Sequence, residues 1–382
     1  MQLSLPTNKC SFLNQTCFEK TQRQPFHHRR LKRVPPLRAV GMDDLTMDAQ
    51  KLGVSFTPIH EDFGAEVSGM DLSGGISEAA GALVKDALDR FTLLRFRQQT
   101  LEPADEAKLL SFLPHDEERL LKKGESKNPF RTTIPGYPWL TVVPFHMDLD
   151  DYYGLTAKRT PVVPLFQSRL TWHMDLSNQP CPAMYSYMYM KIAPPKGIAG
   201  TLFASTVKAY SLLTDDQKKM AHKLRKRYYI KEASFKILVR PGAETALCES
   251  GVRFEDPTAI EEAAKNAIPD GCITDEHRVP FVIQEKGTGV RSINASPLKI
   301  HSFEGMTTEE THEFLEEVLG PQAATAPERV WTADWQAGDV VVWKNRHLIH
   351  SAPPRGSYDD PRLFHLVFWE SNEPAIPVED GP

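Results

Sequence analysis

The sequence predicts a mainly β protein with flanking helices, and three observations support this fold class. Short runs rich in β-branched and aromatic residues recur as buried strands require, at residues 92–96, 185–190, 279–283, 290–293, 340–343 and 363–369. Helical patterns are expected in a few segments, which begin near residues 77, 214 and 307. The chain has 382 residues, 41% of them apolar, and six Trp, which suffices for one large core.

The first 45 residues predict a basic, disordered segment ahead of a single domain at 46–382. Residues 1–40 contain eight Lys or Arg and one acid, Glu19, so this stretch has a net charge of +7. Because the whole chain has a net charge of −5, the remaining residues carry −12. A basic, Ser- and Thr-rich stretch without a long apolar run is typical of an organelle transit peptide. We expect a plastid, then a mitochondrion, with the cytoplasm otherwise; a disordered basic tail is the alternative.

Composition narrows the classes of partner. The acidic body would repel phosphate, which argues against nucleic acid. No run of 18 apolar residues occurs, so we expect no membrane partner. The five Cys are odd in number and lack Cys-x-x-Cys spacing, which favours a reducing compartment over a disulfide framework. A small-molecule substrate is the expected partner, and the oligomeric state stays open.

The region before the motifs is expected to run strand, turn, helix and strand over residues 52–100. Ser77 begins the helix, whose apolar stripe is Leu83, Val84, Ala87, Leu88 and Phe91. Residues of about 113–165 are irregular and rich in aromatics, which predicts a long insertion or lid. A structural cap that packs its aromatics on the core is an equal alternative.

The strands and helices of the second half of the chain are predicted from the same kinds of pattern. Residues 185–190 alternate, which predicts a strand whose Tyr side chains pack in the core. Residues 214–227 are expected to form a helix with a solvated basic face. A hairpin is expected around Lys286-Gly-Thr-Gly. Thr307 and Glu310 have the spacing of a capping box, which begins a helix that ends at Leu319.

Four His-x-Asp/Glu pairs occur in the chain, where composition predicts about two by chance. They are His60-x-Asp62, His115-x-Glu117, His146-x-Asp148 and His173-x-Asp175. Residues i and i+2 of a strand point the same way, so a pair on a strand can chelate one ion. Context must therefore separate the four.

The pair of His173 and Asp175 has the most favourable context, because the run that begins at Pro164 is extended, aromatic and β-branched. His60 is followed by Gly64, where a turn is expected. His146 lies in a stretch rich in Pro, Tyr and Asp with turn character, and stays open as a second ligand set.

His350 supplies a second imidazole far along the chain. Two imidazoles and one carboxylate leave coordination positions open for substrate and O2, which is the ligand chemistry of non-haem Fe(II) oxygenases. Arg362 follows twelve residues later and can hold a distal carboxylate by two parallel hydrogen bonds. The set predicts Fe(II) with a dicarboxylate co-substrate, for which 2-oxoglutarate is the obvious candidate.

Several blocks now fall into one order: residues 63–72, 92–99, 172–175, 200–205, 338–352 and 361–365. In this order they resemble the taurine dioxygenase (TauD/TfdA) family of Fe(II)/2-oxoglutarate-dependent dioxygenases, over roughly residues 52–370. The resemblance implies a double-stranded β-helix core, that is, a jelly-roll of cupin type.

Carried over residue by residue, the resemblance makes His173, Asp175 and His350 the iron ligands. His347 competes for the third place, but the family pattern Trp-x-Asn-Arg-x-x-x-His, which starts here at Trp343, selects His350. The resemblance also implies that Thr201 and Arg362 bind the C5 carboxylate of 2-oxoglutarate.

The chain departs from taurine-type enzymes at Leu366, where they place an arginine for the sulfonate, so taurine is rejected as the substrate. Arg169 and His146 are candidate polar anchors for a carboxylate. The candidate pocket residues are Trp172, Met174, Leu176, Asn178, Asn294, Ser296 and Leu366.

The resemblance thus implies oxidation of a small organic or amino-acid-derived metabolite, with release of succinate and CO2. Hydroxylation, desaturation and oxidative cyclisation all stay open, and the transit-peptide prediction points to specialised metabolism in a plant or alga. Two other classes remain. One is a hydrolase with a zinc-bound water on the same ligands, which gives Thr201 and Arg362 no role. The other is a cupin-like protein that binds a ligand without chemistry.

Overall fold

The computed structural model describes residues 42–114, 132–157, 172–198, 200–229, 273–297, 300–352, 360–370, 373–374 and 376–378. All of these lie within Arg38–Pro382, which is one compact unit. Arg169, the pair at His115 and most of the predicted basic segment lie outside the described ranges. No helix within these ranges has the length and apolar character needed to cross a bilayer.

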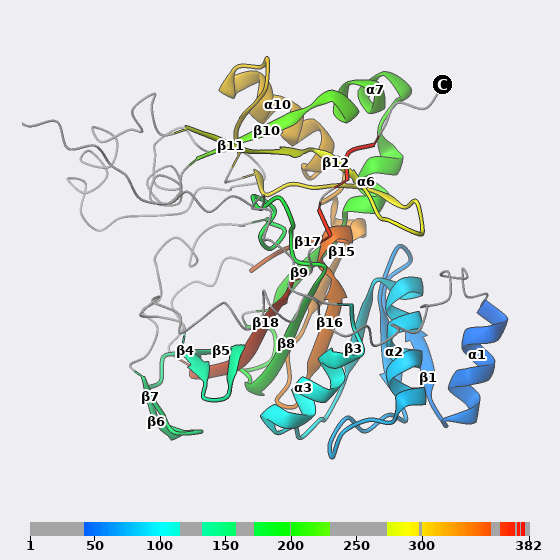
Figure 1. Cartoon of the computed structure of the whole chain (residues 1–382), viewed down its shortest axis with the longest axis vertical. Helices are drawn as coiled ribbons and strands as arrows, with labels where there is room; N and C mark the ends of the chain where they lie inside the picture. The colour runs from blue at the N-terminus through cyan, green and yellow to red at the C-terminus, as the bar shows by residue number, and fades with distance from the viewer. Residues whose placement is uncertain are drawn as a thin grey trace, which may run out of the picture. The chain divides into compact units, whose positions relative to one another are not determined.

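Eight of the described strands form one sheet, in the order β1-β2-β3-β16-β8-β18-β5-β4 (Figure 1). β2 and β3 pair in parallel, whereas the other neighbours are antiparallel. The apolar run Val340-Val-Val-Trp explains why β16 is buried on both faces inside this sheet. The strands are β1 (Ser55–Pro58), β2 (Ala65–Ser68), β3 (Leu93–Phe96), β4 (Thr132–Ile134), β5 (Tyr137–Phe145), β8 (Tyr185–Ile192), β16 (Val340–Lys344) and β18 (Arg362–Trp369).

A second sheet packs against the first one. Its described strands, in the order β15-β9-β17, are β15 (Val330–Ala333), β9 (Thr201–Ser205) and β17 (Leu348–Ser351). Side chains alternate along a strand, so Phe203 and Leu348 join an apolar cluster with Met188 and Trp343 of the large sheet. The ring centroids of Phe203 and Trp343 are 5.3 Å apart. Facing sheets of this kind confirm the predicted mainly β class.

Smaller sheets complete the β structure of the described chain. β10 pairs with both β11 and β14, β12 pairs with β13, and β6 pairs with β7. The β12–β13 hairpin is the one predicted around Lys286, with shorter strands. The bounds are β6 (Leu149–Tyr152), β7 (Leu155–Ala157), β10 (Arg225–Tyr229), β11 (Ile273–Pro280), β12 (Val282–Gln284), β13 (Arg291–Ile293) and β14 (Ile300–Phe303).

Helices flank the sheets, as predicted. They are α1 (Met42–Lys51), α2 (Glu78–Phe91), α3 (Pro103–Ser111), α6 (Thr206–Leu212), α7 (Asp215–Lys223) and α10 (Thr308–Leu319), with 3-10 turns η3 (Pro327–Arg329) and η4 (Asn345–His347). The Ser77 hydroxyl caps α2 by accepting the N–H of Ala80 at 3.2 Å. The predicted capping box of α10 is confirmed, because Thr307 and Glu310 each accept the other's backbone N–H.

β8 separates two apolar clusters. Tyr185, Tyr187 and Tyr189 belong to the apolar cluster that residues of α2 and α3 form with the large sheet. Figure 1 shows α2 and α3 beside this sheet. Ser186 and Met188 point the other way, toward the second sheet. The predicted core role of the aromatic stripe is confirmed, and the opposite face of β8 is left to line the space between the two sheets.

Helix α1 begins inside the segment 1–45 that the sequence predicts to be disordered. Its residues Leu45 and Ala49 are each 3% exposed and lie in the cluster of α2. The spacing of Leu45 and Ala49 along one helical face therefore describes this part of the segment better than the basic composition of residues 1–40 does. The folded domain starts at Met42 or before, so the boundary at residue 46 was placed too late.

The predicted insertion at 113–165 contributes strands to the large sheet. Residues 141–145 of β5 pair with β18, and the ring of Trp139 packs edge-on against Trp369 with centroids 5.2 Å apart. Within the described part of this stretch, the structural alternative fits better than a lid. Pro138 and Pro144 hid the strand in the sequence, because proline usually argues against a strand inside a sheet.

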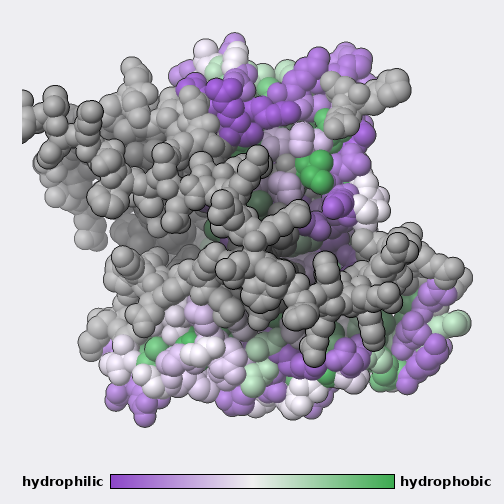
Figure 2. Space-filling view, in the orientation of Figure 1, coloured by the Kyte–Doolittle hydropathy of each residue, from purple (hydrophilic) through white to green (hydrophobic). Residues whose placement is uncertain are grey.

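The predicted helix over 214–227 ends early. α7 stops at Lys223, and the coloured surface over it is mainly hydrophilic, as expected for a solvated face (Figure 2). Lys226, however, is fully buried in β10, so the prediction of a solvated helical face was wrong for this residue. Residue type alone did not reveal this, because a lysine is normally exposed.

On the helix-covered face of the large sheet, His365 and Glu106 form a buried pair. Nδ1 of His365 lies 2.6 Å from Oε1 of Glu106, both side chains are 0% exposed, and the Tyr152 hydroxyl lies 2.8 Å from Nε2. We expect His365→Phe to lower the free energy of unfolding by about 3 kcal/mol, because the Glu106 carboxylate loses its partner inside the core. Urea denaturation measures this loss.

Two further measurements accompany that variant. His365 points away from Arg362 and Leu366 along β18, so His365→Phe should bind iron as the wild type does. The double variant with Glu106→Leu should recover part of the lost stability, since both polar partners are then gone. An unchanged denaturation midpoint in His365→Phe would contradict the importance of the pair.

Candidate metal centre

Two histidines from distant segments are held together by a backbone bridge. The N–H of His173 donates to the carbonyl of His350 at 2.9 Å, and the N–H of His350 donates back at 2.8 Å. Their ring centroids are 4.2 Å apart. The expected strand at His173 is thus a single bridge on the edge of β17, and residues 164–171 lie outside the described ranges.

Asp175 faces both imidazoles. Its Oδ1 lies 3.7 Å from Nε2 of His173 and 3.7 Å from Nε2 of His350. The hydroxyl of Ser186 donates to the other carboxylate oxygen, Oδ2, at 2.6 Å. Ser186 therefore orients the carboxylate so that Oδ1 is turned to the histidines, and a hydrogen bond of this kind can fix the orientation of a candidate metal ligand.

Asn345 locks the loop that bears Asp175. Its Oδ1 accepts the N–H of Asp175 at 2.9 Å, and its Nδ2 donates to the carbonyls of Asp175 and Ala183 at 2.8 and 2.9 Å. Asn345 is fully buried at the start of η4. This gives a physical reason for an asparagine in the Trp-x-Asn-Arg block, five residues before the candidate ligand His350.

Aromatic rings enclose one side of the centre. His350 is 8% exposed and packs against Phe203, at a centroid distance of 5.8 Å, and Trp343, at 5.4 Å. Apolar walls restrict water and fix the imidazole, both of which favour a defined coordination geometry. His173 is the more exposed of the two candidate histidine ligands, with a side chain 31% exposed.

The donor set fits the metal that the sequence predicts. Candidate ligand atoms of His173, Asp175 and His350 all lie within 4.8 Å of one another, and this is the one such group of three in the described chain. Two neutral imidazoles and one carboxylate on one side of an ion are the facial set of non-haem Fe(II) oxygenases.

The competing histidines lie elsewhere. His347 is buried beside Glu285, with 3.9 Å between Nε2 and Oε2. Desolvation, with the Lys344 charge as a smaller cause, lowers the pKa of His347 to about 4. His60 lies in an irregular loop and accepts the N–H of Asp62 at 3.1 Å.

His146 occupies a turn between β5 and β6, as predicted, with a positive φ of 54°. It belongs to no group of three candidate ligands among the described residues. The alternative of a second ligand set at His146 therefore receives no support from the described geometry.

Thr201 and Arg362 begin strands β9 and β18 on opposite sheets. Thr201 is 6% exposed, and its Oγ1 accepts the indole N–H of Trp335 at 3.0 Å. Arg362 is 1% exposed, and its Cζ lies 4.7 Å from the ring centroid of Phe364. Both side chains are thus buried polar groups at the apolar cluster between the sheets, where an anion would meet little competition from water.

The predicted pocket residues divide into two sets. Trp172 and Met174 are 2% and 0% exposed in the apolar cluster that includes α10. Neighbouring residues of an extended chain point to opposite sides, so these two face away from the histidine–aspartate group. Their placement does not support the prediction that they line a substrate pocket.

Asn294 and Ser296 also serve the scaffold. The hydroxyl of Ser296 bonds to the backbone of Met174 on both sides, at 3.1 and 2.9 Å. The side chain of Asn294 is 0% exposed and donates to the carbonyl of Pro280 at 3.3 Å. The prediction that Asn294 and Ser296 contact substrate is therefore not supported either.

Three predicted pocket residues lie at positions that are compatible with contact to a substrate. Leu176, with φ of 53°, and Asn178 are partly exposed in the turn that follows Asp175. Leu366 lies on the same face of β18 as Phe364 and is 9% exposed. Their contact with substrate stays a prediction.

Lys226 forms hydrogen bonds to the backbone of the turn that follows Asp175. Its Nζ donates to the carbonyls of Ser177 at 3.2 Å and Asn294 at 2.6 Å, and the Tyr228 hydroxyl also donates to Ser177 at 2.7 Å. Burial lowers the pKa of the Lys226 amine well below 10.5. Two carbonyl acceptors match the two N–H bonds of a neutral amine, which accords with that direction.

We expect the stability of the wild type relative to Lys226→Met to rise with pH. Between the lowered pKa of the folded state and 10.5, the unfolded chain binds a proton at this residue and the folded chain does not. Stability then rises by up to about 1.4 kcal/mol per pH unit in that window, a slope that Met cannot give. Urea denaturation from pH 7 to 10 tests this, and identical slopes would contradict it.

The family model described as taurine catabolism dioxygenase TauD, TfdA family matches residues 55–367. The alpha-ketoglutarate-dependent 2,4-dichlorophenoxyacetate dioxygenase of Burkholderia sp. (strain RASC) is 26% identical over 292 residues, which cover 76% of this chain and 86% of the relative. Pentalenolactone F synthase of Streptomyces avermitilis is 25% identical over 323 residues, with coverage of 82% and 93%.

Solved structures agree with the architecture. The crystal structure of a taurine dioxygenase from Burkholderia xenovorans superposes with a TM-score of 0.57 at 21% identity, covering 85% of this chain and 93% of that one. At this identity the likeness concerns the fold, and it confirms the predicted jelly-roll core.

Proposed function

We propose residue roles and a substrate class for this chain, which belongs to the taurine catabolism dioxygenase TauD, TfdA family. The chain is accordingly an Fe(II)- and 2-oxoglutarate-dependent dioxygenase that oxidises a small molecule with release of succinate and CO2. We assign His173, Asp175 and His350 to the iron. The observation that carries this assignment is the convergence of their ligand atoms within 4.8 Å.

The chain's own residues prepare the centre for its ligands. Bound iron would offer open coordination positions to the keto-acid end of 2-oxoglutarate and to O2. The backbone bridge between His173 and His350 sets the spacing of the imidazoles before any metal binds. Ser186 holds one oxygen of Asp175, which leaves the other to carry negative charge toward the cation.

Thr201 and Arg362 are the proposed site for the C5 carboxylate of 2-oxoglutarate. Both are buried at the ends of strands that border the space between the sheets. A guanidinium can bind a carboxylate through two parallel hydrogen bonds, and a hydroxyl can add a third. This pair argues against the zinc hydrolase alternative, which has no use for a dicarboxylate site.

The proposed substrate is a small organic molecule without a sulfonate. Leu366 stands where taurine-type enzymes place an arginine, and it lies among Val143, Met188 and Phe364 in an apolar cluster. The relatives named above are, by their names, a dioxygenase of 2,4-dichlorophenoxyacetate and a synthase of pentalenolactone F. We propose a mainly apolar substrate, oxidised by hydroxylation, desaturation or oxidative cyclisation.

A turnover screen tests the function. Full-length protein loaded with Fe(II) is given O2, 2-oxoglutarate and a panel of apolar carboxylic acids and amino-acid derivatives, and succinate and product masses are measured. We expect succinate formation that a true substrate accelerates, with product that gains one oxygen or loses two hydrogens. Product that gains the elements of water without 2-oxoglutarate would favour the hydrolase, and absence of succinate would favour a binding protein.

We also propose that residues 1–40 direct the enzyme to a plastid and are dispensable for folding. Their charge of +7 and lack of a long apolar run support this, because such a segment buries little surface. A protein that starts near Gly41 should be soluble and bind Fe(II) with unchanged affinity. Insoluble protein or lost iron would contradict the proposal.

A further inference from the structure

The Thr201 hydroxyl has one hydrogen bond among the described residues, and its direction is determined by its partner. Nε1 of Trp335 lies 3.0 Å from Oγ1 of Thr201. An indole N–H can donate but cannot accept, so the threonine oxygen is the acceptor in this bond. The hydroxyl hydrogen is then left for a different acceptor.

The positions of Thr201 and Trp335 show which part of the protein surrounds the Thr201 hydroxyl hydrogen. Thr201 lies on the same face of β9 as Phe203, whose ring packs on His350 with centroids 5.8 Å apart. Trp335 belongs to the same apolar cluster as Phe203 and is 3% exposed. The hydroxyl therefore sits in a water-poor region next to the candidate iron centre.

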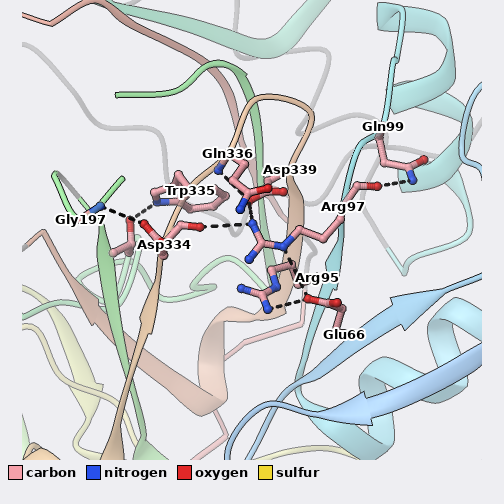
Figure 3. Close-up of polar contacts among 10 residues, drawn as sticks. Glu66, Arg95, Arg97, Gln99, Gly197, Asp334, Trp335, Gln336 and Asp339 are labelled. Atoms are coloured by element: carbon pink, nitrogen blue, oxygen red, sulfur yellow. Dashed lines mark hydrogen bonds and ion pairs between the residues drawn. The ribbon is translucent and has the colours of Figure 1, made fainter. Parts of the chain in front are cut away.

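The loop that carries Trp335 is held on both sides (Figure 3). It connects β15 to β16, and Arg97 donates to the carbonyl of Asp334 at 3.2 Å and to Oδ2 of Asp339 at 2.6 Å. The N–H of Gln336 donates to the same carboxylate oxygen at 2.9 Å. Asp339 is 1% exposed, so its carboxylate is shielded from water, and the bonds at Asp334 and Asp339 restrain the loop on either side of Trp335.

We infer that Trp335 is a positioning residue for co-substrate binding: its indole N–H occupies one lone pair of Thr201 and so directs the hydroxyl hydrogen to the C5 carboxylate of 2-oxoglutarate. This rests on the proposed role of Thr201. A threonine hydroxyl otherwise rotates among several staggered positions, and a fixed acceptor bond reduces that freedom before the ligand arrives. Trp335 touches neither iron nor co-substrate in this scheme and acts through Thr201.

The test compares two keto acids on the anaerobic Fe(II) protein by the absorption band that appears on binding. 2-Oxobutanoate has the same keto-acid end as 2-oxoglutarate but lacks the C5 carboxylate. Trp335→Phe keeps an aromatic ring and removes the donor. We expect about tenfold weaker 2-oxoglutarate binding and unchanged 2-oxobutanoate binding. Equal weakening of both acids would overturn the inference, since it would mean a general disturbance of the site.

A double-mutant cycle supplies the second readout. In Thr201→Val, the further change Trp335→Phe should have no effect on 2-oxoglutarate affinity, because the group through which Trp335 acts is absent. Additive losses would overturn the inference. If Thr201→Val alone leaves affinity unchanged, the proposed role of Thr201 fails together with it; if Thr201→Val weakens binding and Trp335→Phe does not, the inference alone fails.

Arg97→Lys keeps the test decisive if Trp335→Phe does not fold. Arg97 has a side chain 24% exposed and anchors the loop from outside the cluster. Both bonds to the loop come from one nitrogen, Nη1 of Arg97, and lysine keeps the charge but places its shorter side chain's nitrogen differently. A smaller loss that is again selective for 2-oxoglutarate supports the inference, and a loss common to both keto acids, or none, contradicts it.

Discussion

Iron binding should be lost in His173→Ala, Asp175→Ala and His350→Ala. Each change removes one of three protein ligands from an ion whose remaining positions belong to small molecules, so too few bonds remain to hold it. Iron content after anaerobic reconstitution with Fe(II) and gel filtration measures the result. Ser186→Ala should still bind iron, but with about tenfold lower affinity, because Asp175 loses the hydrogen bond that orients it.

His347→Ala and His146→Ala are the matched controls, and both should retain a full equivalent of iron. His347 is the more stringent control, because it is buried three residues before His350 and its removal disturbs the same segment. Thermal denaturation of each variant separates lost iron from lost fold. If His347→Ala loses iron while His350→Ala keeps it, the assignment of the third ligand is wrong.

Regular strands were predictable because local sequence alone marks them. β8, β16 and β18 have alternating or continuous apolar residues, and their predicted and observed bounds agree closely. α2 and α10 were predictable for a similar reason, since Ser77 and Thr307 mark their first turns. In such elements the local preference and the tertiary structure point the same way.

Elements whose local signals conflict with their tertiary setting were not predictable. β5 contains Pro138 and Pro144, which normally disfavour a strand, yet it pairs with β18. Lys226 is polar by type but buried by its strand neighbours on both sides. Such outcomes depend on contacts between segments far apart in the chain, which spacing along the chain does not encode.

The residues of the candidate centre show the same difference between local signals, which the sequence reveals, and contacts between distant segments, which it does not. The grouping of His173 with Asp175 was predictable because i and i+2 spacing is a local property, and the inclusion of His350 rested on the family resemblance at the Trp343 block. The same alternation argues against Trp172 and Met174 as pocket residues, a conclusion that the sequence already permitted. Ser186 offered a weaker signal, as the small polar residue opposite an aromatic stripe.

Loss of Arg362 should cost most of the affinity for 2-oxoglutarate. In Arg362→Leu the C5 carboxylate enters a buried region without its bidentate partner, and we expect a loss on the order of 3–5 kcal/mol. Titration of 2-oxoglutarate into the anaerobic Fe(II) protein, followed by the absorption band of the complex, measures the affinity. Binding of 2-oxobutanoate should change little, because it has no carboxylate at that end.

Leu366→Val is the matched control on the same face of β18, four residues further along the strand. It should leave 2-oxoglutarate affinity unchanged and alter the preference among primary substrates, because it reshapes an apolar wall and removes no charge. Leu366→Arg should recruit sulfonates only weakly, since an added charge lacks a shaped pocket. If Arg362→Leu binds 2-oxoglutarate as the wild type does, another residue holds the C5 carboxylate, and the positions of co-substrate and substrate along β18 must be reassigned.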